Sequence, residues 1–96
     1  VRKGRKPARP RLAKQEIEVM AEMEHERWNL ERIFGGWTWS KEREVARKRS
    51  PYLVVWPGLP DNVKQWDRDA VRKIPDNLTK VDLEVRRARR APRRAP

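Results

Sequence analysis

The stretch from Gln15 to Phe34 contains neither glycine nor proline, and two glycines, Gly35 and Gly36, follow it directly. The stretch is rich in strong helix formers and carries apolar residues at helical spacing, so it predicts one long α-helix over about residues 15–34. The paired glycines predict the end of this helix, because glycine adopts the left-handed conformation of a helix C-cap at little cost. The remainder of the chain must therefore pack against a single long helix.

The predicted helix carries apolar side chains on two adjoining sides: Ile17, Met20, Ala21 and Trp28 on one, and Val19, Met23, Leu30 and Phe34 on the other. We therefore expect the helix to be broadly buried. Glu24 projects into the first of these sides, where a carboxylate needs a partner. Arg27 and His25 both lie within reach of it.

Residues 37–60 predict irregular structure, and two further helices are expected after them. Tyr52 to Trp56 predict a short strand or an extended loop, because prolines and a glycine bracket them. A helix is expected with Asp61 as its N-cap, and Pro75 ends that helix and opens another at its first turn. Leu83 and Val85 alternate with charged residues, as in a brief terminal strand. The apolar positions expected to face inward are Val63, Trp66, Ala70, Val71, Ile74, Leu78 and Val81.

This pattern predicts a mainly α (α+β) fold with a long N-terminal helix, a Gly-Gly turn, an irregular or short-strand middle segment, two C-terminal helices and a short end strand. A chain of 96 residues makes one domain at most, and its core must be dense in large side chains, which five tryptophans could supply. With no cysteine and one histidine, the chain offers no disulfide, no thiolate metal site and no His-rich zinc centre. His25-Glu26 resembles the start of a helical zinc motif, but Asn29 occupies the position of the second ligand.

Catalysis has little support in the sequence. The hydroxyl candidates for a nucleophile are Thr38, Ser40, Ser50 and Thr79, and one imidazole must serve as the base for any of them. No glycine-rich phosphate loop is present, and no apolar run approaches the roughly 20 residues needed to span a bilayer. We expect a soluble, cytoplasmic protein without enzymatic activity, cofactor or membrane partner.

The net charge of +11 is concentrated in the two ends of the chain. Thirteen of the 25 basic residues lie in residues 1–14 and 86–96, which contain no acid, so the twelve in the middle face all 14 acidic residues. This division predicts a basic disordered tail over residues 1–14, a folded domain over 15–85 and a second basic tail over 86–96. The tails either keep the protein soluble or grip the phosphates of nucleic acid. The arginines expected to contact phosphate are Arg5, Arg9, Arg11, Arg89, Arg90, Arg93 and Arg94.

Aromatic and basic residues alternate through the middle of the chain, at Trp37, Trp39, Lys41, Arg43, Arg47, Lys48, Arg49, Tyr52 and Trp56. Indole faces stack on planar ligands, and nearby arginines hold phosphates or add cation–π contacts. The alternative is that these tryptophans form the core of a small domain. We expect that one indole of the Trp-x-Trp pair at Trp37 and Trp39 seals the core and the other helps to form a groove.

The order of several short elements resembles the RyR domain, a repeat found in ryanodine receptors and in bacterial and phage proteins. The elements are His25-Glu26-x-Trp28, Gly36-Trp37-x-Trp39, Arg43-Glu44, Lys48, Pro51-x-Leu53-Val54 and Leu59-Pro60. The likeness covers about residues 16–85. It departs from the family pattern at Ser40, Glu44, Ser50 and Asp82.

The resemblance implies a compact, mostly helical, noncatalytic module that binds a nucleotide-like small ligand or a protein partner. The residues that it implies for the ligand site are Trp37, Trp39, Arg43, Lys48 and Trp56. It also implies that His25 and Glu26 hold the helix against the Gly-Trp turn, with Trp28, Gly35 and Gly36 in structural roles. Because the family's receptors use repeats in tandem, pairing into a homodimer is a further expectation.

Overall fold

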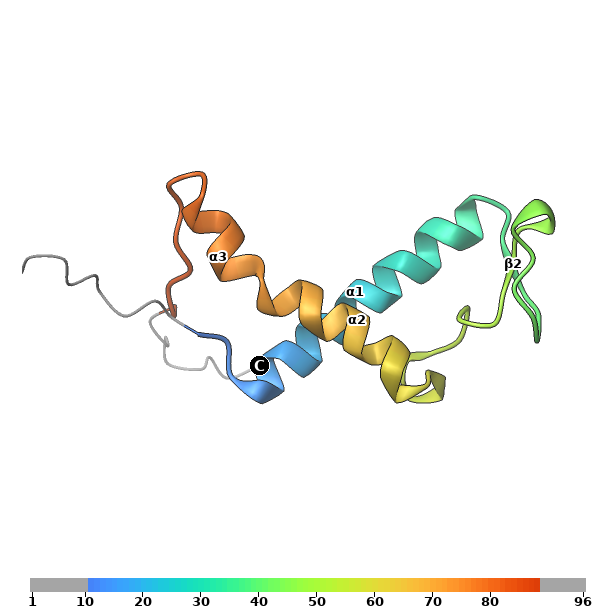
Figure 1. Ribbon diagram of the computed structural model, residues 1–96, viewed down its shortest axis with the longest axis horizontal. Helices are drawn as coiled ribbons and strands as arrows, with labels where there is room; N and C mark the ends of the chain where they lie inside the picture. The colour runs from blue at the N-terminus through green and yellow to red at the C-terminus, as the bar shows by residue number, and fades with distance from the viewer. Residues whose placement is uncertain (1–10, 89–96) are drawn as a thin grey trace, which may run out of the picture.

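The computed structural model describes residues 11–88 of the chain. The helices and strands in chain order are α1 (Lys14–Phe34), β1 (Thr38–Trp39), the 3₁₀ turn η1 (Val45–Arg47), β2 (Arg49–Ser50), the 3₁₀ turn η2 (Trp56–Gly58), α2 (Asp61–Arg72) and α3 (Ile74–Thr79). Helices α1 and α2 cross, the strands lie beyond the C-terminal end of α1, and α3 lies at the opposite end of the molecule (Figure 1). The fold is mainly helical, as predicted, and it includes a small two-stranded sheet.

Helix α1 begins and ends where its sequence predicts. At its start the backbone N–H of Ala13 donates to the Glu16 carboxylate at 2.6 Å, which satisfies one of the donors that a helix start leaves free. At its end Gly36 has a φ of 89°, in the left-handed region that favours glycine. The N–H of Trp37 then donates to the carbonyl of Arg32 at 2.9 Å, so the chain turns sharply away from the helix axis.

The core lies where α1 and α2 cross. Ala21 has no exposed surface, because its small side chain allows the two helices to approach closely. The buried apolar residues are Ile17 and Ala21 of α1, Trp56 and Leu59 around η2, and Val63 and Val71 of α2. Leu12, Met20, Tyr52, Val54 and Ile74 pack against them partly buried. The buried core thus combines one tryptophan and one leucine with alanine and β-branched residues.

The expectation that α1 is broadly buried is wrong. Its second apolar side faces away from the crossing, and Val19, Met23, Leu30 and Phe34 are exposed, Phe34 by 85%. Within residues 11–88, α2 is the helix that packs along α1, and it covers one side of it. The tryptophans follow the same division: Trp56 is buried, Trp28 and Trp37 are half-buried, and Trp39 and Trp66 are exposed.

Two local expectations also need correction, the N-cap of α2 and the short end strand, and two others hold. Pro60, not Asp61, is the N-cap of α2, and Asp61 is the first helical residue. The segment from Tyr52 to Trp56 forms a loop that ends in η2, the second of the two outcomes foreseen for it. No strand forms around Leu83 and Val85, because residues 83–88 lie against no strand partner in the described part of the chain. Pro75 does open α3 within its first turn, as predicted.

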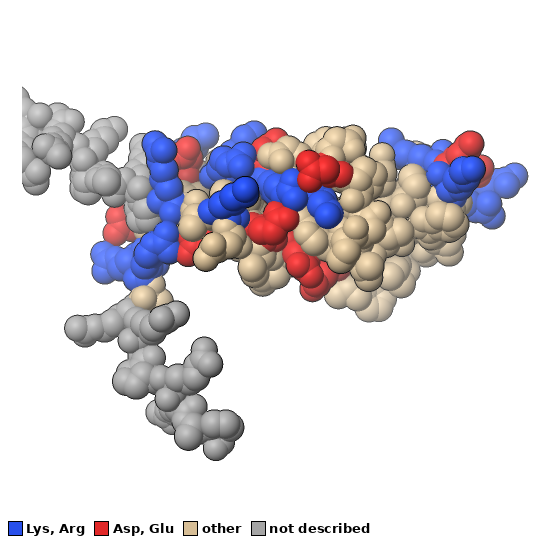
Figure 2. Space-filling model, turned by 90° about the horizontal axis from the view of Figure 1, so that it is seen from below, with Lys and Arg blue, Asp and Glu red and all other residues tan. Residues whose placement is uncertain are grey.

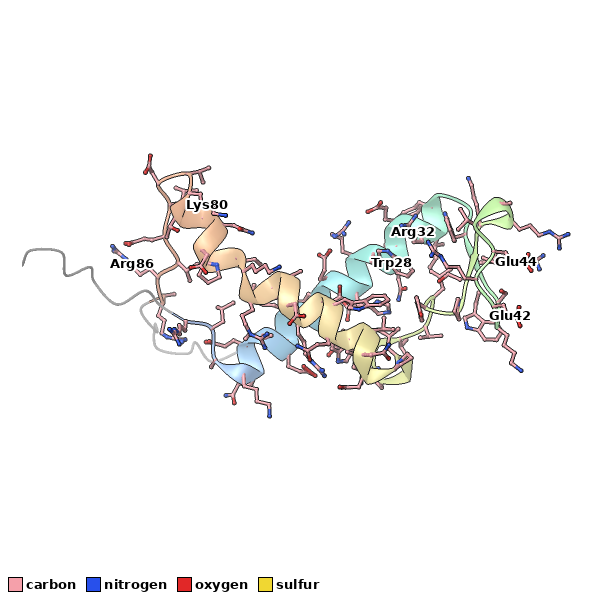
Figure 3. The ribbon with its side chains drawn as sticks, viewed as in Figure 1. Trp28, Arg32, Glu42, Glu44, Lys80 and Arg86 are labelled. Carbon is pink, nitrogen blue, oxygen red and sulfur yellow. The ribbon has the colours of Figure 1, made fainter. Side chains whose placement is uncertain are left out.

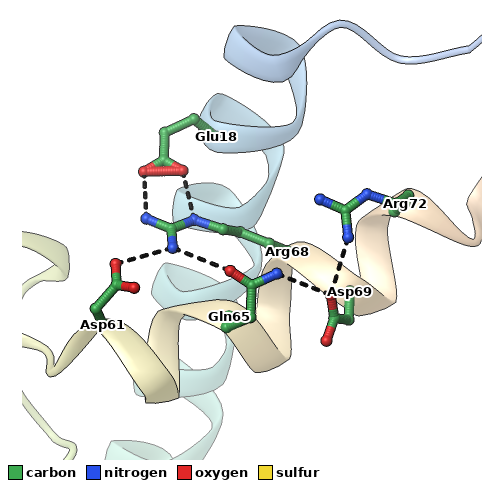
Figure 4. A network of polar contacts seen from close by, with 6 residues as sticks. All are labelled: Glu18, Asp61, Gln65, Arg68, Asp69 and Arg72. Atoms are coloured by element: carbon green, nitrogen blue, oxygen red, sulfur yellow. Dashed lines mark hydrogen bonds and ion pairs between the residues drawn. The ribbon is translucent and has the colours of Figure 1, made fainter.

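Arg68 of α2 joins the two crossing helices through a network of polar contacts (Figure 4). Its Nε and Nη2 donate to the two carboxylate oxygens of Glu18 on α1, at 2.7 and 2.8 Å, and its Nη1 donates to Asp61 at 3.0 Å. The same guanidinium lies 5.8 Å from the ring centre of Trp56. Two parallel charge-assisted hydrogen bonds fix both distance and orientation, so Arg68 sets how α2 lies on α1.

Arginines lower the pKa of three glutamates in this fold. The first cause for Glu16, Glu18 and Glu24 is a side-chain hydrogen bond, from Arg87, Arg68 and Arg27 respectively. A carboxylate whose pKa is lowered in the folded state stabilises the fold above its unfolded pKa, and this stabilisation is lost as pH falls through the folded value. Burial raises the pKa of Asp67, which has the opposite effect.

We expect acid to destabilise the protein. Protonation removes the stabilising contacts of Glu16, Glu18 and Glu24, whereas it relieves the unfavourable burial of charge at Asp67 alone. The urea midpoint should fall between about pH 5 and about pH 3. In Arg68→Met the fall should be smaller, because Glu18 then titrates near its ordinary value. Arg72→Met, which removes a peripheral contact to Asp69, should keep the fall of the natural chain. A midpoint that is unchanged across this range would contradict the role given to these pairs.

Candidate functional site

The two short strands place the Trp-x-Trp segment beside a run of basic residues. Strands β1 and β2 are parallel, with Thr38 opposite Arg49 and Trp39 opposite Ser50. Glu44 forms an isolated antiparallel bridge with Arg49, so the intervening loop folds back on the strand pair. This region, residues 37–50, is called the sheet end below. It lies beyond α1 and away from the helix crossing, where Figure 3 labels Glu42 and Glu44.

Four of the five residues expected to bind a ligand lie at the sheet end. Trp39 is 56% exposed, and Arg43 is exposed. Trp37 is half-buried, with the guanidinium of Arg32 lying 4.9 Å from its ring centre. Lys48 adopts a left-handed backbone conformation and donates from Nζ to the carbonyl of Gly35 at 2.9 Å, which ties β2 to the end of α1.

The sheet end carries more cations than its own carboxylates neutralise. Lys41, Arg43, Arg47, Lys48 and Arg49 are all exposed. Arg47 lies 3.7 Å from Glu44, and within residues 11–88 the other four form no ion pair. Figure 2 shows lysine and arginine side chains gathered at this end, with acidic side chains among them. The region therefore combines an open indole with cations that are available to an anion.

The fifth residue, Trp56, lies in the core instead of the groove expected for it. Only 7% of its surface is exposed, and it packs with the buried residues of α1 and α2. Lys64 and Arg68 lie 5.5 and 5.8 Å from its ring centre. The prolines and glycine around this residue predicted a loop, but they gave no sign that the loop folds inward.

His25 has a structural role, but a different one from that expected. It is 3% exposed, and its Nε2 lies 2.7 Å from the carbonyl oxygen of Val54, which also accepts from Asn29 Nδ2 at 3.0 Å. The imidazole therefore donates from Nε2 and holds α1 against the loop before η2, not against the Gly-Trp turn.

The two glutamates beside His25 differ in their contacts. Glu26 is exposed and makes no hydrogen bond to a described residue. Glu24 is paired with Arg27, as predicted.

A second candidate site, a pocket between α1 and α2, was not anticipated from the sequence. Its lining residues are His25, Trp28, Tyr52, Val63, Trp66 and Asp67, and its volume is about 110 Å³. Tyr52 and Trp66 meet edge to face with ring centres 6.0 Å apart. In the sequence, the neighbouring Trp66 and Asp67 were the only indication of a binding pocket, but the sequence did not show which other segments would pack around them. We call it the aromatic pocket.

Most of the tail arginines expected to contact phosphate lie outside the described residues: Arg5, Arg9, Arg89, Arg90, Arg93 and Arg94. The two ends of the described part of the chain contact each other. Arg87 pairs with Glu16 and donates to the backbone carbonyl of Arg11 at 3.1 Å. Residues 11 and 87 therefore lie together, at the end of the molecule opposite the sheet end (Figure 1).

A family model, the RyR domain, matches residues 10–87. The match spans every helix and strand of the described structure and includes both the sheet end and the aromatic pocket. It confirms the family that the order of motifs indicated. Among residues 11–88, no helix has the length and apolar character needed to cross a lipid bilayer.

Proposed function

Because the chain belongs to the RyR domain family, whose membership indicates a recognition or ligand-binding module in general, we propose that it binds a nucleotide-like small ligand without catalysis. The binding surface in this proposal is the sheet end. An acidic segment of a protein partner is the alternative occupant of the same surface. The observation that carries the proposal is the exposed indole of Trp39 in the same short region as four cations that form no ion pair within residues 11–88.

These residues suit a ligand that combines a flat ring with phosphate. Stacking of a base on an exposed aromatic ring is worth about 1–3 kcal/mol and requires little sequence-specific geometry. The guanidinium of Arg43 can bind a phosphate with two parallel hydrogen bonds. Lys48 uses one of its three N–H donors on Gly35, and the other two remain for an anion.

The surroundings of these residues keep them in place. Trp37 lies under Arg32, and Lys48 is tied to the end of α1, so neighbouring parts of the sheet end are fixed before a ligand arrives. Such preorganisation reduces the entropy lost on binding.

The proposal that the chain has no catalytic activity is supported by His25, the single histidine of the chain, which is buried and bonded to Val54. The sheet end therefore has no imidazole to act as a base.

We expect ADP to raise the melting temperature of the full chain, because it binds only the folded state. The shift should be lost in Trp39→Ala and reduced in Arg43→Ala, and it should weaken with added salt. Trp66→Ala and Arg72→Ala, which change exposed residues elsewhere, should keep the shift. Adenosine, which has no phosphate, should give a smaller shift than ADP.

An equal ADP shift in the natural chain and in Trp39→Ala would refute the proposed surface. A single-stranded RNA oligonucleotide in the same assay tests the other function considered for this chain, in which the basic tails grip phosphate. RNA binding that is lost when the tail arginines are changed to glutamine, but kept in Trp39→Ala, would support the tails as the functional element.

A further inference from the structure

We propose that the aromatic pocket between α1 and α2 binds an organic ammonium cation, such as a quaternary or methylated amine. This site is separate from the sheet end and has the opposite charge preference. Its walls come from three segments of the chain, with Trp28 on α1, Tyr52 on the loop after β2, and Trp66 and Asp67 on α2.

Trp66 and Tyr52 provide the aromatic surface that a methylated cation requires, because Arg32 and His25 already lie against the ring of Trp28. The π-faces of tryptophan and tyrosine are negative and attract cations, most strongly where water is excluded. Trp66 is 59% exposed and meets Tyr52 edge to face, so ring surface remains accessible at the pocket mouth. The buried side chain of Val63 contributes an apolar wall that suits methyl groups.

Asp67 supplies the negative charge. Its carboxylate is half-buried, lines the pocket, and accepts no hydrogen bond from the described residues. Burial is the main cause that raises its pKa, which means that the ionised form lacks sufficient compensation in the unliganded protein. A bound cation would provide this compensation, whereas a phosphate would be repelled.

Two basic side chains near Asp67, Arg27 and His25, make their hydrogen bonds to other groups. Arg27 donates to Glu24 and to Glu31, with N–O distances of 2.6 Å to each. His25 uses Nε2 on the carbonyl of Val54. Neither side chain forms an ion pair with Asp67, and the charge interactions of both, which lower its pKa, are outweighed by burial.

The size of the pocket limits the ligand to a small head group. Its volume of about 110 Å³ is well below the roughly 300–1,000 Å³ of pockets for drug-sized ligands. A trimethylammonium group can enter while the remainder of the molecule stays outside. The cation can be carried by a free small molecule or by a modified side chain of another protein, since both present the same chemistry.

The test is a calorimetric titration of the full chain with choline chloride at constant ionic strength. Its neutral carbon isostere, 3,3-dimethylbutan-1-ol, has the same shape without the charge. We expect saturable binding of choline that is about tenfold weaker in Trp66→Ala and in Asp67→Asn. A peptide with trimethyllysine, compared with the same peptide with lysine, tests whether a protein-borne cation is preferred to free choline.

Two matched controls separate the pocket from general effects. Asp69→Asn changes an exposed carboxylate on the same helix, and Trp39→Ala changes an exposed indole at the sheet end, so both should bind choline like the natural chain. Asp67→Asn removes a poorly compensated charge and should fold at least as well as the natural chain. Equal binding of the neutral isostere, unchanged choline binding in Asp67→Asn, or no saturable binding of either the choline or the peptide would overturn the proposal.

Discussion

Replacing Trp56 with alanine should cost about 3–5 kcal/mol of the free energy of unfolding, as large-to-small changes of buried aromatics do. Trp56 is the largest side chain of the core and touches the region where α1, η2 and α2 meet. It also lies under Lys64 and Arg68, so its loss loosens the contact between Arg68 and Glu18. Because small domains have a total stability of about 5–15 kcal/mol, a large fraction of the chain should unfold on mild warming.

Urea unfolding followed by circular dichroism measures this effect. Trp39→Ala is the matched control, because it removes the same side chain from an exposed position and should change stability by about 0.5 kcal/mol or less. If Trp39→Ala were as costly as Trp56→Ala, the core would not lie at the crossing of the helices.

Enlarging Ala21 to leucine should destabilise the protein by about 1–3 kcal/mol, because the added atoms have no space at the crossing. Ala21 has no exposed surface and lies between buried residues of both helices. Ala70→Leu makes the same change at an exposed position of α2 and should be nearly neutral, since alanine and leucine are both strong helix formers.

The same urea experiment measures the free energy of unfolding of both leucine variants, Ala21→Leu and Ala70→Leu. A stability of Ala21→Leu equal to that of Ala70→Leu would show that α1 and α2 do not approach closely at residue 21. A smaller m-value in Ala21→Leu alone would instead show that the variant no longer unfolds from the same packed state.

The local parts of the fold could be predicted from the sequence, because they depend on nearby residues. Helix α1 ends at Phe34 and Gly36 is left-handed, since only glycine adopts that conformation cheaply at the end of a helix. Pro75 opens α3 for an equally local reason. The pairing of Glu24 with Arg27 follows from their spacing on one helix.

The features that depend on which segments meet could not be predicted. The helical wheel showed two apolar sides of α1, but not that only the side with Ile17 and Ala21 would find a partner. The family resemblance implied that Trp56 lines the ligand site, whereas its loop turns it into the core. The aromatic pocket requires Tyr52 and Trp66, which come together only after the loop and α2 have folded.

The two proposed recognition surfaces lie apart on one helix-crossing core, and the indole N–H signals of the five tryptophans in an NMR titration test this separation most directly. With signals assigned by single substitutions, ADP should shift the Trp39 signal and leave Trp66 unmoved. Choline should shift Trp66 and leave Trp39 unmoved. A shift of the Trp66 signal with ADP while the Trp39 signal stays unmoved, or five signals that neither ligand moves, would contradict two separate surfaces.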